Sequence, residues 1–369
     1  MKITKIDIFG IRLPLKQPFI IAYDRYDDME TILTRMETDE GSVGWGEAVP
    51  DQHVTGETWE STFQIVKQEL APLIIGENPF SIDAIHKKMN EKIYGAPSAK
   101  AAIDIALYDL MGKIAGQPLY QLLGGRAHTE LETPQVISIS SPEEMASEAG
   151  ALIKQGYRNI KIKVGMGDPS LDIERIKAVR KAILPETRLR VDANQGWDRI
   201  SALKVINETK DCQVDWYEQP VKAHDLKSMQ EIRSAAHAKI MVDEGVHNPY
   251  DLLRVIEMRA ADLLNIKLMK AGGIYPALAL ANISEAAGLP CQVGSMVESA
   301  IGTMAGAHLS IARTIIETNE MVGPKMFTKD VAEVVYHQDV LEIPETPGLG
   351  IEVDEDFVKE NMIFHCVVE

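Results

Sequence analysis

This chain has few cysteines and fewer basic than acidic residues, and each of these features argues against certain classes of protein. The three cysteines (Cys212, Cys291 and Cys366) are an odd number without metal-type spacing, so they imply neither a disulfide framework nor a zinc knuckle. The formal net charge is -17 and the sequence pI is about 5.0. An acidic balance of this size argues against nucleic acid or an anionic membrane as the partner.

Long apolar runs are also missing. No stretch approaches the 18 apolar residues of a membrane span, and the first residues, Met1 to Lys5, are not followed by a signal-type apolar core. We therefore expect a soluble cytoplasmic protein. With 369 residues, of which 45% are hydrophobic, the chain can bury a large core and is long enough for two domains.

The first third is typical of a compact α+β unit. Strands are predicted at Lys2–Leu13, Glu30–Glu37 and Val43–Glu47, and the segment between the first two, residues 18–28, is expected to be a loop because it is too long for a tight hairpin. A loop of that length is either a lid over a binding site or a plain surface loop. Helical periodicity follows at residues 58–73, 79–93 and 98–111, with Ser98 as the expected cap of the last helix.

From about Leu131 short apolar runs alternate with amphipathic segments. Eight such runs are found, at residues 133–139, 159–164, 189–192, 214–218, 239–243, 263–267, 290–294 and 315–322. Eight strand–helix units predict an α/β protein with a (β/α)₈ TIM-type barrel. A doubly wound open sheet is the alternative, but Gly165-Met166-Gly167 does not continue into the glycine-rich phosphate turn of that fold.

Charged residues recur at the ends of five successive runs, about one strand–helix unit apart: Lys163, Asp192, Glu218, Asp243 and Lys267. In a barrel these are neighbouring strands whose carboxyl ends surround the mouth of the active site. Three adjacent carboxylates repel one another unless a divalent cation holds them, and an oxygen-only set without histidine favours Mg²⁺ over zinc. Taken singly, each acid would be a solvated strand end or a helix cap.

The lysines flank the acids. Lys163 precedes them around the barrel and Lys267 follows, so the two are expected to face each other across the metal. Lys161 shares the face of Lys163 and is expected to contact the substrate carboxylate. Burial and the cationic neighbours, namely the metal and Lys161, are expected to lower the pKa values of Lys163 and Lys267 toward ~7–8, the range of a general base. One lysine on each side of an α-carbon makes racemisation or epimerisation the natural reaction, because a proton lost on one side can return on the other.

Several motifs resemble the enolase superfamily, in its muconate-lactonising subgroup. They are K-I-K-V-G (161–165), V-D-A-N-Q-G-W (191–197), Y-E-Q-P (217–220), V-D-E (242–244), N-I-K-L-M-K-A-G-G-I (265–274), G-W-G-E-A (44–48) and A-K-A-A-I-D-I-A-L-Y-D-L (99–110). The resemblance implies Mg²⁺ on the three acids, acid/base roles for Lys163 and Lys267, a small-molecule carboxylate as the substrate, and a homo-oligomer.

The same resemblance implies three segments. They are a capping domain (1–125), a barrel domain (126–324) and a C-terminal segment (325–369) that returns to the cap. Asn194 and Glu244 resemble residues that hold the metal ligands and Lys267 in place; a purely structural polar role is the alternative.

The closest resemblance within the subgroup is to dipeptide epimerases and N-succinyl amino acid (Arg/Lys) racemases. Ala-Glu epimerases carry an Asp-x-Asp for the substrate ammonium where this chain has Glu320-Met321-Val322-Gly323, and a basic residue where it has Asp24. With Asp51 in the other capping loop, this reversal of charge implies a cationic side chain on an N-acylated substrate.

We therefore expect racemisation of N-succinyl or other N-acyl lysine and arginine. The acyl group is expected near Ser295, Met296, Met321 and Gly323, and Thr133 is a further expected contact. The alternatives are a dipeptide epimerase, an o-succinylbenzoate synthase or cycloisomerase, and, from another class, a non-catalytic barrel that binds acidic metabolites.

Overall fold

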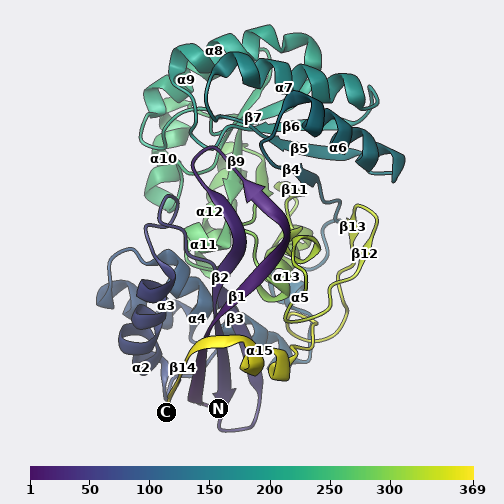
Figure 1. Ribbon diagram of the computed structural model, residues 1–369. Helices are drawn as coiled ribbons and strands as arrows, with labels where there is room; N and C mark the ends of the chain where they lie inside the picture. Colours follow the sequence, from purple (N-terminus) through teal and green to yellow (C-terminus); the bar gives the residue numbers. More distant parts are fainter.

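The computed structural model describes residues 1–369. A four-stranded antiparallel sheet joins the two ends of the chain in the order β14-β1-β2-β3. Its strands are β1 (Ile3–Ile20), β2 (Arg25–Thr38), β3 (Val43–Ala48) and β14 (Met362–Val368). β14 pairs with β1 from Ile6 to Ile11, so the C-terminal segment returns to the N-terminal sheet, as expected. The two termini lie side by side at the foot of the molecule (Figure 1).

Helices pack against this sheet and against one another. They are α1 (Trp59–Ile65), a π-helical turn (Val66–Leu70), α2 (Ala71–Ile74), α3 (Ile82–Lys92), α4 (Pro97–Ala115) and α5 (Leu119–Leu122). The expected cap at Ser98 is wrong, because α4 begins one residue earlier with Pro97. The Glu57 carboxylate accepts hydrogen bonds from the backbone N–H groups of Ser98 (2.8 Å) and Ala99 (3.0 Å) instead, and its charge suits the positive end of the helix.

The expected loop at residues 18–28 is also corrected. β1 and β2 run on to a short turn, with Phe19 opposite Tyr26 and Ile20 opposite Arg25, and Ile21 N–H donates to the Asp24 carbonyl at 3.1 Å. A shift of register between Pro14 and Phe19 lets the long hairpin bend, and it rises from the cap toward the barrel (Figure 1). The aromatic and β-branched residues at its tip favour strand over loop.

The barrel contains eight parallel strands in sequential order: β4 (Gln135–Ile137), β5 (Asn159–Lys163), β6 (Arg188–Asp192), β7 (Val214–Glu218), β8 (Lys239–Val242), β9 (Leu263–Ile266), β10 (Cys291–Val293) and β11 (Ile316–Asn319). The predicted (β/α)₈ barrel with an α+β cap is confirmed. No backbone ladder joins β4 to β11; there the Asn319 amide donates to the Glu132 carbonyl at 2.8 Å, and the Arg190 guanidinium reaches across the interior to Gln292 at 3.3 Å.

The barrel helices alternate with these strands: α6 (Pro142–Lys154), α7 (Pro169–Ala182), α8 (Arg199–Glu208), α9 (Leu226–Ala235), α10 (Pro249–Met258), α11 (Leu268–Ala271), α12 (Ile274–Ala287) and α13 (Ala300–Ala312). The last segment adds α14 (Gly323–Met326), the pair β12 (Tyr336–His337) and β13 (Val340–Leu341), and α15 (Glu355–Asn361). None of the helices has both the length and the apolar character needed to cross a bilayer. The domain boundaries at residues 125 and 324 stay a prediction.

Candidate active site

The ends of five neighbouring strands gather the charged residues that the sequence singled out. Lys163 lies opposite Asp192 in the β5–β6 pair, and Asp192 lies opposite Glu218 in the β6–β7 pair. Asp243 and Lys267 follow the last residues of β8 and β9. All three carboxylates are fully buried. The short parallel strands end in the same plane, so one residue from each points toward the barrel mouth.

Lys163 and Lys161 project on the same side of β5 but have different partners. The Lys163 ammonium donates to the Asp192 carboxylate at 2.6 Å and to the Asn194 side-chain oxygen at 3.1 Å. Lys161 is almost completely buried and pairs with three carboxylates: Asp192 at 2.9 Å, Glu218 at 2.8 Å and Glu320 at 2.5 Å. The pairing of Lys161 with Glu320 joins the second and eighth strands of the barrel.

Asp243 lies between two lysines. The Lys267 and Lys270 nitrogens are each 2.8 Å from one of its carboxylate oxygens, yet neither oxygen accepts a hydrogen bond of good geometry. Lys270 also donates to the carbonyls of Val246 (3.0 Å) and Asn265 (3.2 Å). Sequence reasoning missed Lys270, although it lies three residues after Lys267, which caps the start of α11, and this spacing was a usable signal.

Carboxylates surround two of the buried lysines. Burial acts to lower the pKa of Lys267, but Asp243, Glu244 and Glu218 outweigh it and raise that pKa well above its usual value. Burial likewise opposes a raised pKa for Lys161, which Asp192, Glu218 and Glu320 bring about. Without a metal ion, the nearest charges to Lys267 are carboxylates rather than cations. The lowered lysine pKa that the sequence suggests depends on a bound cation and stays a prediction.

Burial and mutual repulsion affect the pKa values of the clustered carboxylates. Burial and the charge of Asp192 raise the pKa of Glu218 to about 8, despite the opposing effect of Lys161. No group of three or more histidine, cysteine, aspartate or glutamate side chains converges as it would around a metal ion, since the lysines hold the acids. The donor set nevertheless fits a hard divalent cation: three buried carboxylates on adjacent strand ends, with both Asp243 oxygens lacking a hydrogen-bond donor.

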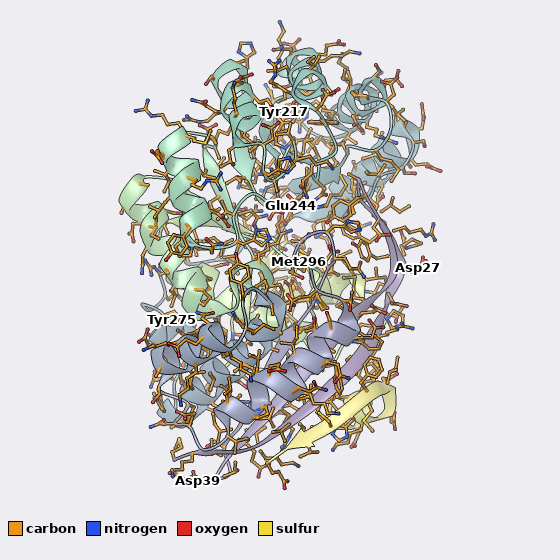
Figure 2. All side chains as sticks on the ribbon, turned by 90° about the vertical axis from the view of Figure 1, so that its left-hand side faces the viewer. Asp27, Asp39, Tyr217, Glu244, Tyr275 and Met296 are labelled. Atoms are coloured by element: carbon orange, nitrogen blue, oxygen red, sulfur yellow. The ribbon has the colours of Figure 1, made fainter.

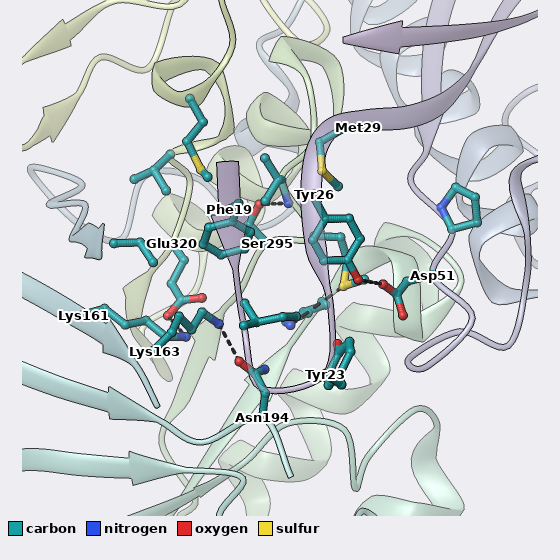
Figure 3. Close-up of a pocket in the computed structure, with 18 residues that line it drawn as sticks. Phe19, Tyr23, Tyr26, Met29, Asp51, Lys161, Lys163, Asn194, Ser295 and Glu320 are labelled. Atoms are coloured by element: carbon teal, nitrogen blue, oxygen red, sulfur yellow. Dashed lines mark hydrogen bonds and ion pairs between the residues drawn. The ribbon is translucent and has the colours of Figure 1, made fainter. Parts of the chain in front are cut away.

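A cavity opens above this cluster, between the barrel and the long hairpin. Lys161, Lys163, Lys267, Asn194 and Glu320 line its floor. The hairpin supplies Phe19, Ile21, Tyr23, Tyr26 and Met29, which the sequence analysis did not name, although it offered a lid over a binding site as one interpretation of this segment. Figure 3 shows the two lysines of β5 on one side of the cavity, with Tyr26 and Asp51 on the other.

The two acids expected at the side-chain end of the substrate differ in position. Asp51 lines the cavity, is 9% exposed, and accepts a hydrogen bond from the Tyr26 hydroxyl at 2.5 Å. Asp24 sits at the turn of the hairpin with 43% of its side chain exposed and does not line the cavity. The hairpin pairing turns Asp24 outward, 3.9 Å from the exposed ring of His53.

The residues expected near the acyl group are also divided. Ser295 and Met296 line the cavity, whereas Met321 and Gly323 do not; their neighbours Val322 and Met326 do. Thr133 precedes β4, its hydroxyl donates to the Asp339 carbonyl at 3.0 Å, and it does not line the cavity; its expected substrate contact stays a prediction. Met321 is wrapped inward against Gly306, and a side chain at residue 323 would collide with the Glu298 carbonyl.

Asn194 and Glu244 adjoin the cluster, and their expected role in holding the metal ligands and Lys267 stays a prediction. The Asn194 amide donates to Glu244 at 3.2 Å, while its oxygen accepts from Lys163, and its backbone N–H donates to Asp192 at 2.9 Å. Glu244 is buried between the barrel and the cap (Figure 2), and burial with the charge of Asp243 raises its pKa to about 7. The contacts of Asn194 fix the positions of the Lys163 and Asp192 side chains.

Comparison with known proteins decides the family. Residues 3–124 match the mandelate racemase / muconate lactonizing enzyme N-terminal domain, and residues 144–357 match the enolase C-terminal domain-like family. This chain belongs to the enolase superfamily. Members of this superfamily generally depend on a divalent metal, and racemase and epimerase relatives make the chain an isomerase.

Two curated relatives in the superfamily cover nearly the whole chain. An N-succinyl-L-Arg/Lys racemase from Bacillus cereus is 48% identical over 369 residues, with 100% of both chains covered. An L-Ala-D/L-Glu epimerase from Clostridium acetobutylicum is 40% identical over 356 residues, covering 95% of this chain and 99% of the relative.

Solved structures of racemases and epimerases are also similar to this chain over its whole length. The crystal structure of the Bacillus cereus N-succinyl Arg/Lys racemase has a TM-score of 0.98 at 48% identity, with 100% of each chain covered. A dipeptide epimerase from Cytophaga hutchinsonii, complexed with Mg and the dipeptide D-Ala-L-Val, has a TM-score of 0.96 at 34% identity, again with 100% of each chain covered.

Proposed function

We propose that this isomerase racemises N-succinyl or other N-acyl derivatives of lysine and arginine by 1,1-proton transfer, with Mg²⁺ as its metal. The observation that carries the proposal is the pair Lys163 and Lys267. The two side chains line one cavity from strands β5 and β9, which stand four positions apart in the eight-stranded sheet. Ammonium groups on opposite sides of one space can serve the two faces of a single α-carbon.

In the forward step, one lysine in its neutral form accepts the α-proton of the substrate, and the bonding electrons move into the carboxylate to give an enediolate. The other lysine, as its ammonium, donates a proton to the opposite face. The product is the mirror-image amino acid, and the two lysines exchange protonation states. The reverse reaction uses the same groups in opposite roles, so one site turns over both enantiomers.

Asp192, Glu218 and Asp243 would hold the metal, which would stabilise the negative charge that develops on the substrate carboxylate. The side chains that now pair with lysines would turn their oxygens toward the cation. Lys161, already charged and buried beside Asp192 and Glu218, is suited to contact the same substrate carboxylate. Asn194 would keep Lys163 aimed at the α-carbon through its 3.1 Å hydrogen bond.

The preference for a cationic side chain is supported by Asp51. Its carboxylate lies in the cavity wall, held by Tyr26, where the far end of a lysine or arginine substrate would reach. Buried charge pairs of this kind add both affinity and selectivity. Tyr23 and Tyr26 add aromatic faces to the same end of the cavity, which suit a cation as well.

The preference for an acylated amine is supported by Glu320. It is the one acid at the end of the eighth strand, and its carboxylate already pairs with Lys161 at 2.5 Å. A free substrate ammonium would find no unpaired carboxylate there. An acyl group would instead meet Ser295, Met296, Val322 and Met326, which form a mostly apolar wall.

A dipeptide epimerase is the second candidate, favoured by the 40% identical relative that is named as an L-Ala-D/L-Glu epimerase. The test is polarimetry of the purified protein with Mg²⁺ on N-succinyl-L-Lys, N-succinyl-L-Arg and L-Ala-L-Glu. The proposal expects loss of optical rotation with the first two at a kcat/KM at least about 100-fold above that for the dipeptide, since a missing charge partner costs about 3 kcal/mol. The opposite order of kcat/KM would overturn it.

A further inference from the structure

The wall of the cavity next to Lys267 is formed by a short strained loop between β10 and α13. Ser295, Met296 and Val297 all face the cavity. Val297 has a φ of +65°, in the left-handed region that β-branched residues avoid at a cost of about 1–3 kcal/mol. A backbone of this kind persists only where the surrounding contacts hold it.

Those contacts start at one side chain, Glu298, and reach Val297 through the Ser295 hydroxyl. Its carboxylate accepts a hydrogen bond from the Met296 N–H at 2.9 Å and another from the Ser295 hydroxyl, and the Ser295 oxygen in turn accepts from the Val297 N–H at 2.8 Å. Glu298 is 3% exposed. Two oxygens of one carboxylate therefore fix three consecutive residues of the cavity wall.

Glu298 has no lysine or arginine partner. The charged group that faces it is Glu47 of β3, and Asp330 lies beyond Glu47. The start of α13 binds these two acids: Glu47 accepts from Ser299 N–H (2.9 Å) and Gly302 N–H (2.7 Å), and Asp330 accepts from Ala300 N–H (3.0 Å). Burial raises the pKa of Glu298 to about 7. Burying an acid without a cation beside it costs stability.

The Ser295–Val297 loop contacts Lys267, one of the two proposed bases, through Met296. The Met296 sulfur lies 3.8 Å from the Lys267 nitrogen, and Met296 is itself only 8% exposed. Figure 2 shows Met296 at the boundary of barrel and cap. We propose that Glu298 is a positioning residue for Lys267: by holding the Ser295–Val297 loop it presses Met296 against the Lys267 ammonium and so sets proton transfer on that face of the substrate, without touching the substrate itself.

The inference rests on the proposed function, in which each lysine serves one enantiomer. Its test is deuterium incorporation at the α-carbon of N-succinyl-L-Lys and of N-succinyl-D-Lys in D₂O with Mg²⁺. Lys163→Ala and Lys267→Ala first identify which enantiomer depends on which lysine. Glu298→Ala is expected to slow exchange of the Lys267-dependent enantiomer by about 10- to 100-fold, the effect of a displacement near 1 Å, while exchange of the other changes less than about threefold.

Three further variants separate positioning from general damage. Glu298→Gln keeps an acceptor for Met296 N–H and should restore most of the lost exchange. Asp330→Asn alters an acid at the same helix end without touching the loop, so the ratio of the two exchange rates should stay at the wild-type value. If Glu298→Ala does not fold, Ser295→Ala removes the bridge to Val297 and should give the same asymmetry. An equal fall for both enantiomers, or no fall, would overturn the inference.

A second measurement does not depend on the substrate. With methyl-¹³C methionine, the Met296 resonance, assigned with Met296→Leu, should move in Glu298→Ala and stay in Asp330→Asn. If the wild type exchanges neither enantiomer, the proposed function fails, and this spectrum still tests the part of the inference in which Glu298 holds Met296 in place. An unmoved Met296 resonance in Glu298→Ala would contradict it.

Discussion

The Tyr26 hydroxyl donates a 2.5 Å hydrogen bond to the Asp51 carboxylate, across the gap between the hairpin of the cap and the following capping loop. This bond fixes one Asp51 oxygen, while the other accepts the backbone N–H groups of His53 (2.8 Å) and Val54 (3.0 Å). Asp51 is thus held rigidly in the cavity wall, ready to meet a charge.

Replacing Asp51 by Asn should lower kcat/KM for N-succinyl-Lys and N-succinyl-Arg by about 10- to 100-fold. The expected loss corresponds to a hydrogen bond with a charged partner, about 1.5–3 kcal/mol. Steady-state polarimetry measures it. Asp24→Asn is the matched control: its side chain is largely exposed and outside the cavity, so its kcat/KM should stay within about threefold of wild type. Equal effects of the two variants would contradict this assignment.

Metal removal should stop α-proton exchange, and added Mg²⁺ should restore it. Binding to the folded protein alone should also raise the thermal midpoint, because saturation at 100 times Kd stabilises by about 2.7 kcal/mol. Calorimetry with and without Mg²⁺ measures the shift. Asp192→Asn, Glu218→Gln and Asp243→Asn should each reduce it. Exchange that continues at the wild-type rate after thorough chelation would contradict a metal role for these acids.

Acid sensitivity should depend on His308, a buried histidine of α13. Its ring accepts the Tyr120 N–H at 3.2 Å and faces the Leu349 carbonyl at 3.1 Å, and burial lowers its pKa to about 4. A lowered histidine pKa means that the folded state binds fewer protons than the unfolded state between pH 6.5 and 4. Stability is therefore present above pH 6.5 and is lost as the pH falls toward 4, by on the order of 3 kcal/mol.

The variant His308→Gln should flatten this dependence, because an amide does not titrate there. Urea unfolding at several pH values between 7 and 4.5 measures it. His337→Gln, at a side chain that is 69% exposed, is the control and should keep the wild-type slope. A wild-type slope in His308→Gln would show that other groups carry the acid sensitivity.

The sequence predicted the barrel and the charged strand ends because both depend on local periodicity. Lys163, Asp192, Glu218, Asp243 and Lys267 each end an apolar run, and such runs remain strands in the structure. The long hairpin was missed because its pairing depends on a bulge at Pro14–Phe19 that no local pattern marks. Whether Asp24 or Asp51 faces the cavity likewise depends on tertiary packing, which the local sequence does not reveal.

The partners of the buried ion pairs could not be predicted from the sequence either. The sequence placed Lys161 beside Lys163, but its pairing with Glu320 crosses from the second strand to the eighth. The contact between Lys270 and Asp243 was not predictable for the same reason, since Asp243 follows another strand, even though the spacing of Lys270 from Lys267 was a usable signal for Lys270 itself. Because the charges nearest to each lysine come from distant segments, the direction of the Lys267 pKa shift followed only from the folded structure.

The most direct measurement of the central claim is α-proton exchange in D₂O by Lys163→Ala and Lys267→Ala, each with both enantiomers of N-succinyl-Lys and Mg²⁺. We predict that each variant loses racemisation by at least about 100-fold, the usual size of a general acid/base contribution. Each should still exchange one enantiomer with retention, and the surviving enantiomer should differ between the two variants. Loss of exchange on the same enantiomer in both, or racemisation by either at the wild-type rate, would contradict two opposed lysines.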